Sequence, residues 1–416
     1  MGSHKLIFSI GALDVGNDVE VVDDLKIMCT VCEKLNFRLV VVAENRDRIL
    51  SVINKKLQLN GRFQILTYGK QLYEFIREYS GGPETMALVG VQDKDLEVAA
   101  QAKLFLLAAK WVHCDVKVAK YAIPASSPSR LCEILKKVNE QMDWYYRCDL
   151  AGPIPTTVFA LCSANHFGGT WHSVDEISAT SELKKVLQDG DGDPSMKIAL
   201  KCQLLAAMHH TPEFKEVQDW IVAPSSKKKL DDGLVELKEH LRSLTNGGKR
   251  EPVLVRSEEV TQSPSCSPED RQSTEHIQRH FSTVNVNPHC TIKDRLQGRV
   301  VCVIDDYLNY GNTLETLRSL LMACGVKKIL MVALAKFRNV KEIEHKHENY
   351  RMIDNIYTPG GFEIEYKQQN YRIEGDIYSC GGYKATHISN NLILAKFSES
   401  SKRDRDELKK TAKLFK

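Results

Sequence analysis

Short apolar segments alternate with amphipathic helical segments along most of this chain. In the first part, residues 5–10 and 37–43 have the composition of buried strands, and residues 19–35 between them carry apolar side chains at helical spacing. The alternation continues to about residue 125 and resumes near residue 216. Parallel strands need a long crossover between them, and a helix usually supplies it. The pattern therefore predicts an α/β protein with two parallel sheets.

The length, composition and charge of the chain limit the class of protein to which it can belong. Its 416 residues exceed a single domain of roughly 150 residues. Hydrophobic residues make up 43% and charged residues 27%, as in globular proteins. A net charge of +3 excludes a broad nucleic-acid-binding surface. No apolar run approaches the ~18 residues that cross a bilayer, so we expect a cytoplasmic protein without membrane association.

Three regions are predicted from these patterns. We expect a first α/β domain over residues 5–125, a mainly helical or irregular connecting region over 126–215, and a second α/β domain over 216–400. Within the second domain, residues 257–275 contain many serines and almost no apolar side chains, which is typical of a surface loop.

Two features that suggest metal binding have simpler interpretations. Cys29 and Cys32 form a lone CxxC, and their helical spacing with neighbouring apolar residues predicts buried thiols. The run Asp189–Pro194 has alternating acids, but Leu200 stands where a calcium loop needs its glutamate. We therefore expect a turn before a helix there, and we predict no structural metal.

Residues 300–317 carry the strongest functional signal. An apolar strand leads to Asp305 and Asp306, a short polar loop follows, and Thr313 stands before an amphipathic helix as its expected N-cap. Backbone amides at a helix N-terminus favour a phosphate. Adjacent carboxylates beside that phosphate would accept hydrogen bonds from sugar hydroxyls or face a metal ion. The implied ligand is a ribose 5-phosphate group at the carboxyl end of a parallel sheet.

This run resembles the 5-phosphoribosyl-1-pyrophosphate (PRPP) binding motif of type I phosphoribosyltransferases. The resemblance implies that Asp305 and Asp306 hold the ribose hydroxyls and act as the catalytic acidic pair. It also implies that Mg²⁺ accompanies PRPP and that a C-terminal hood, here about residues 343–397, recognises the acceptor. The loop expected to hold the 5-phosphate consists of Asn309, Tyr310, Gly311, Asn312 and Thr313.

The phosphate loop departs from the family pattern at two positions. The family usually has Thr-Thr-Gly where this chain has Asn309-Tyr310-Gly311. In purine-salvage members an aspartate at the place of Asn309 is proposed to be a general base, a role that a carboxamide cannot fill. Tyr310 is larger than threonine and has no aliphatic hydroxyl.

The residues after the first strand of the second domain are candidates for pyrophosphate binding. Ser225, Ser226 and Lys227 follow the apolar run 221–224, at the place of the family's pyrophosphate loop. Hydroxyls, exposed amides and a lysine suit pyrophosphate oxygens. The alternative interpretation is a solvated turn.

The long polar loop refines the resemblance. Arg256, Thr261-Gln262, Arg271 and Phe281 are spaced similarly to residues of ComF-like phosphoribosyltransferases. The resemblance implies that Arg256 and Arg271 bind substrate as the loop closes over the pyrophosphate leaving group and excludes water. The alternative is solubilising charge on a linker.

The first domain is similar to the haloacid dehalogenase-like (HAD-like) fold, mainly over residues 86–107, with Lys70 at the place of the phosphate-binding lysine. The family's catalytic positions hold other residues, and of its acids only Asp95 remains. Those replacements are Ser9 and Gly11 at the nucleophile and acid–base positions, Ala43 for a Ser or Thr, and Val91 for a metal-binding acid. We therefore predict no phosphatase activity and expect a degenerate Rossmann-like domain that serves binding, dimerisation or packing.

Two functional hypotheses follow. The first is a PRPP-dependent enzyme that transfers ribose 5-phosphate to an unknown nitrogen nucleophile. The second is a non-catalytic module that senses a ribonucleotide or PRPP, or a nucleic-acid-associated effector of a bacterial stress or defence system. The first domain is then the expected contact for a protein or nucleic-acid partner, and the sequence leaves open a homo-oligomer.

Overall fold

The computed structural model describes residues 4–371 except 17, 60, 80–84, 141–143, 151–152, 165–173, 190–191, 227–229, 246, 248–251, 261–278, 281, 288–295, 309–310, 338–344 and 352–362. Within these residues the protein is α/β, with two sheets in which parallel pairing dominates. None of the helices in this part of the chain is long and apolar enough to cross a membrane.

The first sheet is six-stranded and parallel throughout, with the order β3-β2-β1-β4-β5-β6. Its strands are β1 (His4–Ser9), β2 (Phe37–Ala43), β3 (Gln64–Thr67), β4 (Met86–Gly90), β5 (Phe105–Ala109) and β6 (Ile123–Ala125). The helices between them are α1 (Ile10–Leu13), α2 (Val19–Lys34), α3 (Arg46–Leu50) with a π-helical continuation (Ser51–Lys56), α4 (Lys70–Tyr79), α5 (Asp93–Ala102) and α6 (Val116–Tyr121), and α7 (Pro128–Glu140) follows β6. The central strands β1, β4 and β5 are almost wholly buried, as the continuous apolar runs predict for a sheet covered on both faces. Cys29 and Cys32 are fully buried on α2, which confirms the interpretation of the CxxC as core thiols.

The second sheet has the order β7-β8-β13-β12-β9, with all pairs parallel except β7 with β8. Its strands are β7 (Tyr146–Leu150), β8 (Thr156–Ser163), β9 (Asp219–Val222), β12 (Val300–Leu308) and β13 (Lys328–Lys336). On one face lie α12 (Asn312–Ala323) and the short antiparallel pair of β10 (Leu254–Arg256) and β11 (Val284–Val286).

The connecting region 126–215 contains two strands that the sequence did not predict. It holds the helices α7, α8 (Val174–Lys184) and α9 (Pro194–His209), but it also supplies β7 and β8. The strand β8 reads TTVFALCS and is buried along its whole length, so its apolar and β-branched residues favour an internal strand. Because β8 lies against β13, the second sheet includes residues on both sides of position 216. The start of α9 follows the prediction, since the Asp193 side chain accepts from Ser195 N and Pro194 opens the helix.

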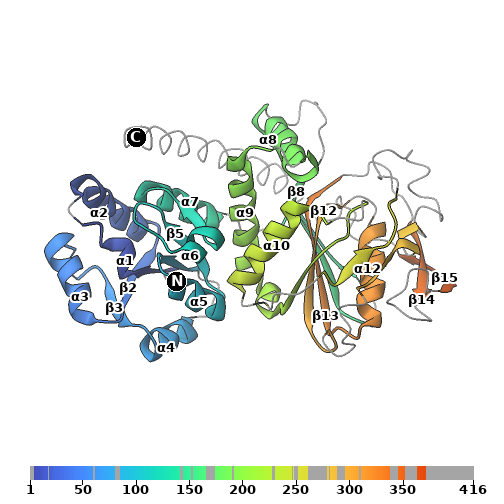
Figure 1. The fold of residues 1–416 in the computed structure, drawn as a ribbon, viewed down its shortest axis with the longest axis horizontal. Coiled ribbons are helices and arrows are strands. Elements are labelled where there is room, and N and C mark those ends of the chain that lie inside the picture. The colour runs from blue at the N-terminus through green and yellow to red at the C-terminus, as the bar shows by residue number, and fades with distance from the viewer. Residues whose placement is uncertain are drawn as a thin grey trace.

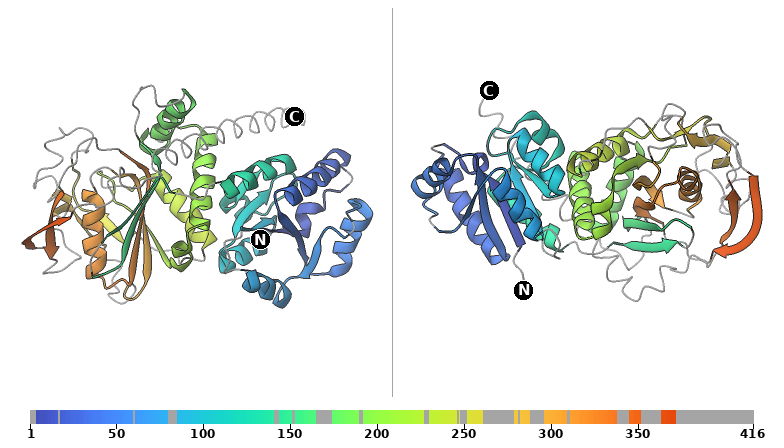
Figure 2. Two further views of the ribbon diagram at one scale, coloured as in Figure 1. Left: turned by 180° about the vertical axis from the view of Figure 1, so that it is seen from behind. Right: turned by 90° about the horizontal axis from the view of Figure 1, so that it is seen from below.

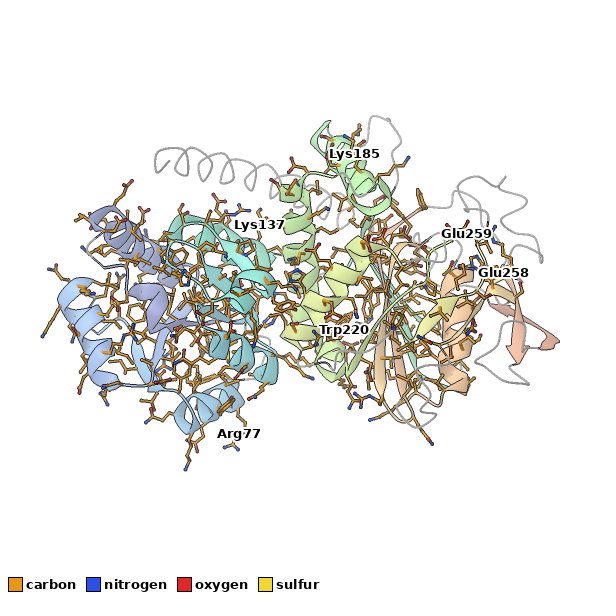
Figure 3. All side chains as sticks on the ribbon, in the orientation of Figure 1. Arg77, Lys137, Lys185, Trp220, Glu258 and Glu259 are labelled. Atoms are coloured by element: carbon orange, nitrogen blue, oxygen red, sulfur yellow. The ribbon has the colours of Figure 1, made fainter. Side chains whose placement is uncertain are left out.

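The two sheets share one hydrophobic core. Helices α9 and α10 (Asp232–Leu244) lie between the sheets (Figures 1 and 2). Buried residues of both sheets and both helices belong to one cluster, for example Leu107 on β5, Leu204 on α9, Leu241 on α10 and Val332 on β13. Side chains fill this layer, and Trp220 of β9 donates a hydrogen bond from Nε1 to Thr245 Oγ1 at 2.7 Å at the end of α10 (Figure 3).

A separate antiparallel pair is formed by β14 (His345–Arg351) and β15 (Glu363–Tyr371). It lies within the span expected to form the hood, and most of the rest of that span is outside the described residues.

Candidate functional site

The loop after β9 and the acidic pair emerge at the same edge of the second sheet. Val222 and Ile304 are register partners of the parallel strands β9 and β12, and Ala223 N donates to Ile304 O at 2.9 Å. Ser225 and Ser226 therefore follow β9 at the sheet edge where the acidic pair follows Ile304. In open α/β sheets this carboxyl edge is where ligands bind.

Asp305 and Asp306 are half-buried at this edge, and the strand continues past them to Leu308 instead of ending there as predicted. Asp306 N donates to Asp305 Oδ1 at 3.0 Å, and Tyr307 N donates to Asp306 Oδ1 at 2.7 Å. Burial raises the pKa of both carboxyl groups, and the charge of Asp306 raises the pKa of Asp305 further. The pair therefore retains a proton to higher pH than an isolated aspartate does.

The two carboxyl groups face different charges. Arg256 lowers the pKa of Asp305 and so partly opposes the effect of burial. Asp231, in contrast, raises the pKa of Asp306. Asp231 is the N-cap of α10, where its Oδ1 accepts from Leu234 N at 2.8 Å. The sequence patterns do not predict Asp231 at this site, although an acid before a helix is a recognisable cap signal.

The Arg256 side chain is buried beside the acidic pair. Its Nε donates to Ser225 O at 2.6 Å, its Nη1 donates to Thr283 Oγ1 at 2.6 Å, and its Nη2 lies 3.3 Å from His280 Nδ1. Burial lowers its pKa to about 10. Each of these three nitrogens is directed at a protein group.

His280 and Thr283 are site neighbours that the sequence did not reveal. Both are buried, and Thr283 Oγ1 also donates to Arg279 O at 2.6 Å. They come after the serine-rich stretch and belong to no motif. Only the pairing of β10 with β11 brings them next to Arg256.

The helix expected to face a phosphate begins earlier than predicted. Gly311, with φ +85°, is the N-cap of α12, and Thr313 lies inside the first turn, so the prediction of Thr313 as N-cap is wrong. Glycine tolerates this left-handed conformation without a Cβ clash. Because glycine has no side chain to accept from the first amides of α12, those amides remain suited to an anion.

The predicted site residues thus divide into two groups. Loops, strand ends and the first turn of α12 at one side of the second sheet supply Ser225, Ser226, Arg256, Asp305, Asp306, Gly311 and Thr313. Lys227, Arg271, Asn309 and Tyr310 lie outside the described residues, as does the side chain of Asn312.

At the corresponding edge of the first sheet, Asp95 is hydrogen-bonded to groups of the protein itself. Asp95 is completely buried, and its Oδ2 accepts from Val91 N at 2.8 Å and Gln92 N at 2.9 Å at the start of α5. Tyr68 Oη donates to Asp95 Oδ1. Lys70, at the place of the phosphate-binding lysine in the resemblance, has a side chain that is 86% exposed, and its Nζ lies 3.8 Å from Glu74 Oε1. At this edge Asp95 is engaged in capping a helix.

Comparisons with known proteins add little to this geometry. No family model matches the sequence, and no curated protein matches it. Among solved structures, UMP synthase from Leishmania donovani is similar at 12% identity, over 82% of this chain and 72% of that chain, with a TM-score of 0.17. A likeness this slight carries no argument about fold or activity.

Proposed function

We propose that the carboxyl edge of the second sheet binds a ribose 5-phosphate group and that the chain is a PRPP-dependent phosphoribosyltransferase. One observation carries this proposal: the acidic pair, the loop after β9 and the glycine-capped start of α12 lie at the same end of one parallel sheet. Each supplies the chemistry that one part of PRPP requires.

In this proposal Asp305 and Asp306 accept hydrogen bonds from the ribose hydroxyls, and the amides at the start of α12 bind the 5-phosphate. Ser225 and Ser226, with Lys227 and Arg271, receive the pyrophosphate. PRPP arrives as its Mg²⁺ complex, which is the substrate. The bond from ribose C1 to the pyrophosphate oxygen breaks, a bond from C1 to the acceptor nitrogen forms, and the proton of that nitrogen passes to the departing pyrophosphate or to water.

A second candidate is a site that binds a ribonucleotide without transfer. It is favoured by Arg256, because three of its nitrogens contact protein groups and are not directed at a leaving group. The carboxamide at Asn309 also offers no general base.

Calorimetry and a pyrophosphate-release assay on the full chain test the proposal. We expect Mg²⁺-PRPP to bind the wild type and Asp305→Asn to bind at least ~10-fold more weakly, because the carboxylate is a charged acceptor. Asp149→Asn removes an equal charge from β7, where Asp149 accepts from Thr157, and should bind normally. Binding of a ribonucleoside monophosphate without pyrophosphate release from PRPP, tested with several nucleobases, would favour the second candidate. If neither ligand binds, the proposed site is wrong.

A further inference from the structure

We infer that Arg256 is a positioning residue, which holds the loop after β9 against the acidic pair and does not contact the ligand. This inference rests on the proposed ribose-phosphate site and assigns Arg256 a role different from the substrate contact that the resemblance implies. The guanidinium joins β10, which carries Arg256, to the β9 loop and to the segment that holds His280 and Thr283.

The direction of the hydrogen bonds supports a role in holding the loop. Arg256 Nε donates to the carbonyl oxygen of Ser225, so it fixes the backbone of the proposed pyrophosphate loop. Ser226 O accepts from Val260 N at 3.0 Å, which ties the same loop to the chain beyond β10. With only 5% of its surface exposed, Arg256 has little area left for a ligand.

The acceptors of Arg256 are a carbonyl, a hydroxyl and an imidazole nitrogen. None of these three acceptors carries a negative charge. The positive charge of the guanidinium is therefore not cancelled by these contacts, and it acts on Asp305. It favours the ionised form of Asp305, which is the form that accepts hydrogen bonds from ribose hydroxyls. Arg256 thus holds the loop in position and also favours the ionised form of Asp305.

Other titratable groups lie near the acidic pair or near Arg256. Asp231 at the start of α10 acts on Asp306, and Arg279 acts on Arg256 from the side of β11. His280 contacts Arg256 directly. A change that displaces Arg256 while leaving these groups in place should therefore shift the ionisation of Asp305 toward higher pH.

The test uses Thr283→Val, which keeps the shape of the side chain and removes one acceptor of Arg256. Its matched control is Thr157→Val, because Thr157 is 6% exposed against 7% for Thr283 and donates to Asp149 on β7, away from the site. Arg256→Lys, which keeps the charge but not the three contacts, is the second variant.

The probe is ribose 5-phosphate, titrated into the full chain between pH 5 and 8. We expect Thr283→Val to weaken binding about 3- to 10-fold, which corresponds to one hydrogen bond. We also expect the midpoint of the pH dependence to move upward. Arg256→Lys should weaken binding further, and Thr157→Val should match the wild type. Weaker binding with an unchanged midpoint would indicate a merely structural role and overturn the inference.

Two measurements without ligand test the positioning role of Arg256 independently of the proposed function. Amide hydrogen exchange at Ala223, Ser225 and Ser226 should become faster in Thr283→Val, and the carboxyl titration of Asp305, followed by NMR, should shift to higher pH. If the wild type fails to bind ribose 5-phosphate while both changes occur, the proposed function fails and the positioning role stands. If the wild type binds and neither change occurs, Arg256 does not position the loop.

Discussion

Nζ of Lys201, on α9, lies 2.9 Å from Nε2 of His240, on α10. Nδ1 of the same imidazole lies 3.2 Å from the carbonyl oxygen of Tyr121, at the end of α6. Burial lowers the pKa of Lys201 to about 8. Burial also lowers the pKa of His240, and the charge of Lys201 lowers it further. A titratable pair therefore lies in the layer that joins the two sheets.

Replacing Lys201 should change how stability depends on pH. The unfolded chain has the ordinary lysine pKa of 10.5, so between about 8 and 10.5 it binds more protons than the folded chain. Wild-type stability should therefore rise with pH across this window, by roughly 3 kcal/mol. In Lys201→Met we expect that rise to disappear and stability at pH 7 to increase. Chemical denaturation from pH 7 to 10 measures both effects, with the exposed Lys197→Met on the same helix as control. An unchanged pH slope in Lys201→Met would contradict the assignment.

Removing a site carboxylate should stabilise the ligand-free protein. The pKa of Asp305 is raised on folding, so the folded chain binds more protons than the unfolded chain above the ordinary pKa of 3.8. Wild-type stability then falls as pH rises from 3.8 toward the folded pKa. Asp305→Asn has no carboxyl group to ionise, so it does not lose this stability as the pH rises. We therefore expect a higher thermal midpoint at neutral pH together with loss of ligand binding. Thermal denaturation without ligand between pH 5 and 8 checks this, with Asp149→Asn as control. A lower midpoint for Asp305→Asn would show that Asp305 is a structural residue.

Beside the first sheet, Asp95 should matter for stability and Lys70 should not. Asp95→Ala leaves two amide donors without their acceptor and removes one of the two partners of the Tyr68 hydroxyl, so we expect a loss of ~3 kcal/mol. Tyr68→Phe should cost ~1 kcal/mol, because Asp95 keeps its amide partners. The exposed Lys70→Ala should stay within ~0.5 kcal/mol of the wild type. Denaturant unfolding of the three variants measures the differences. A large effect of Lys70→Ala would contradict its exposed position.

Gly311 should affect ligand binding through its backbone conformation. At φ +85° an added Cβ is strained, although its nearest neighbour beyond adjacent residues, Leu308 Cδ1, lies at an ordinary 3.9 Å. Gly311→Ala should therefore cost ~1–2 kcal/mol of stability and also weaken ribose 5-phosphate binding, because it disturbs the start of α12. Gly298→Ala is a matched control, with φ +71° and open space around the added Cβ. It should lose similar stability and bind normally. Equal affinities of the two variants would remove the start of α12 from the proposed site.

Strands and helices with continuous patterns were predictable from the sequence. The apolar runs of β2, β4 and β12 and the helical spacing of α2 each specify a buried element through local composition. The motif at Asp305 and Asp306 likewise predicted its own strand and helix. These features depend on neighbouring residues in the chain, which is why a single sequence reveals them.

What could not be predicted depends on contacts between distant segments. The place of β8 beside β13 joins residues more than a hundred positions apart, and its sequence lies among polar residues that suggested a helical linker. The partners of Arg256 come from two segments, the loop after β9 and the segment that holds His280 and Thr283, and no sequence motif links these segments to Arg256. The N-cap at Gly311 instead of Thr313 was missed because glycine and threonine both suit helix starts.

The position of β8 also determines where the chain can be divided. A fragment that starts at residue 216 would lose both β7 and β8, and β13 would become an edge strand. β13 reads KILMVALAK and is almost entirely buried. An exposed apolar edge of this kind pairs readily with other chains. The fragment that contains every predicted phosphoribosyltransferase residue should therefore aggregate, and expression of that half requires the strands from 146 onward.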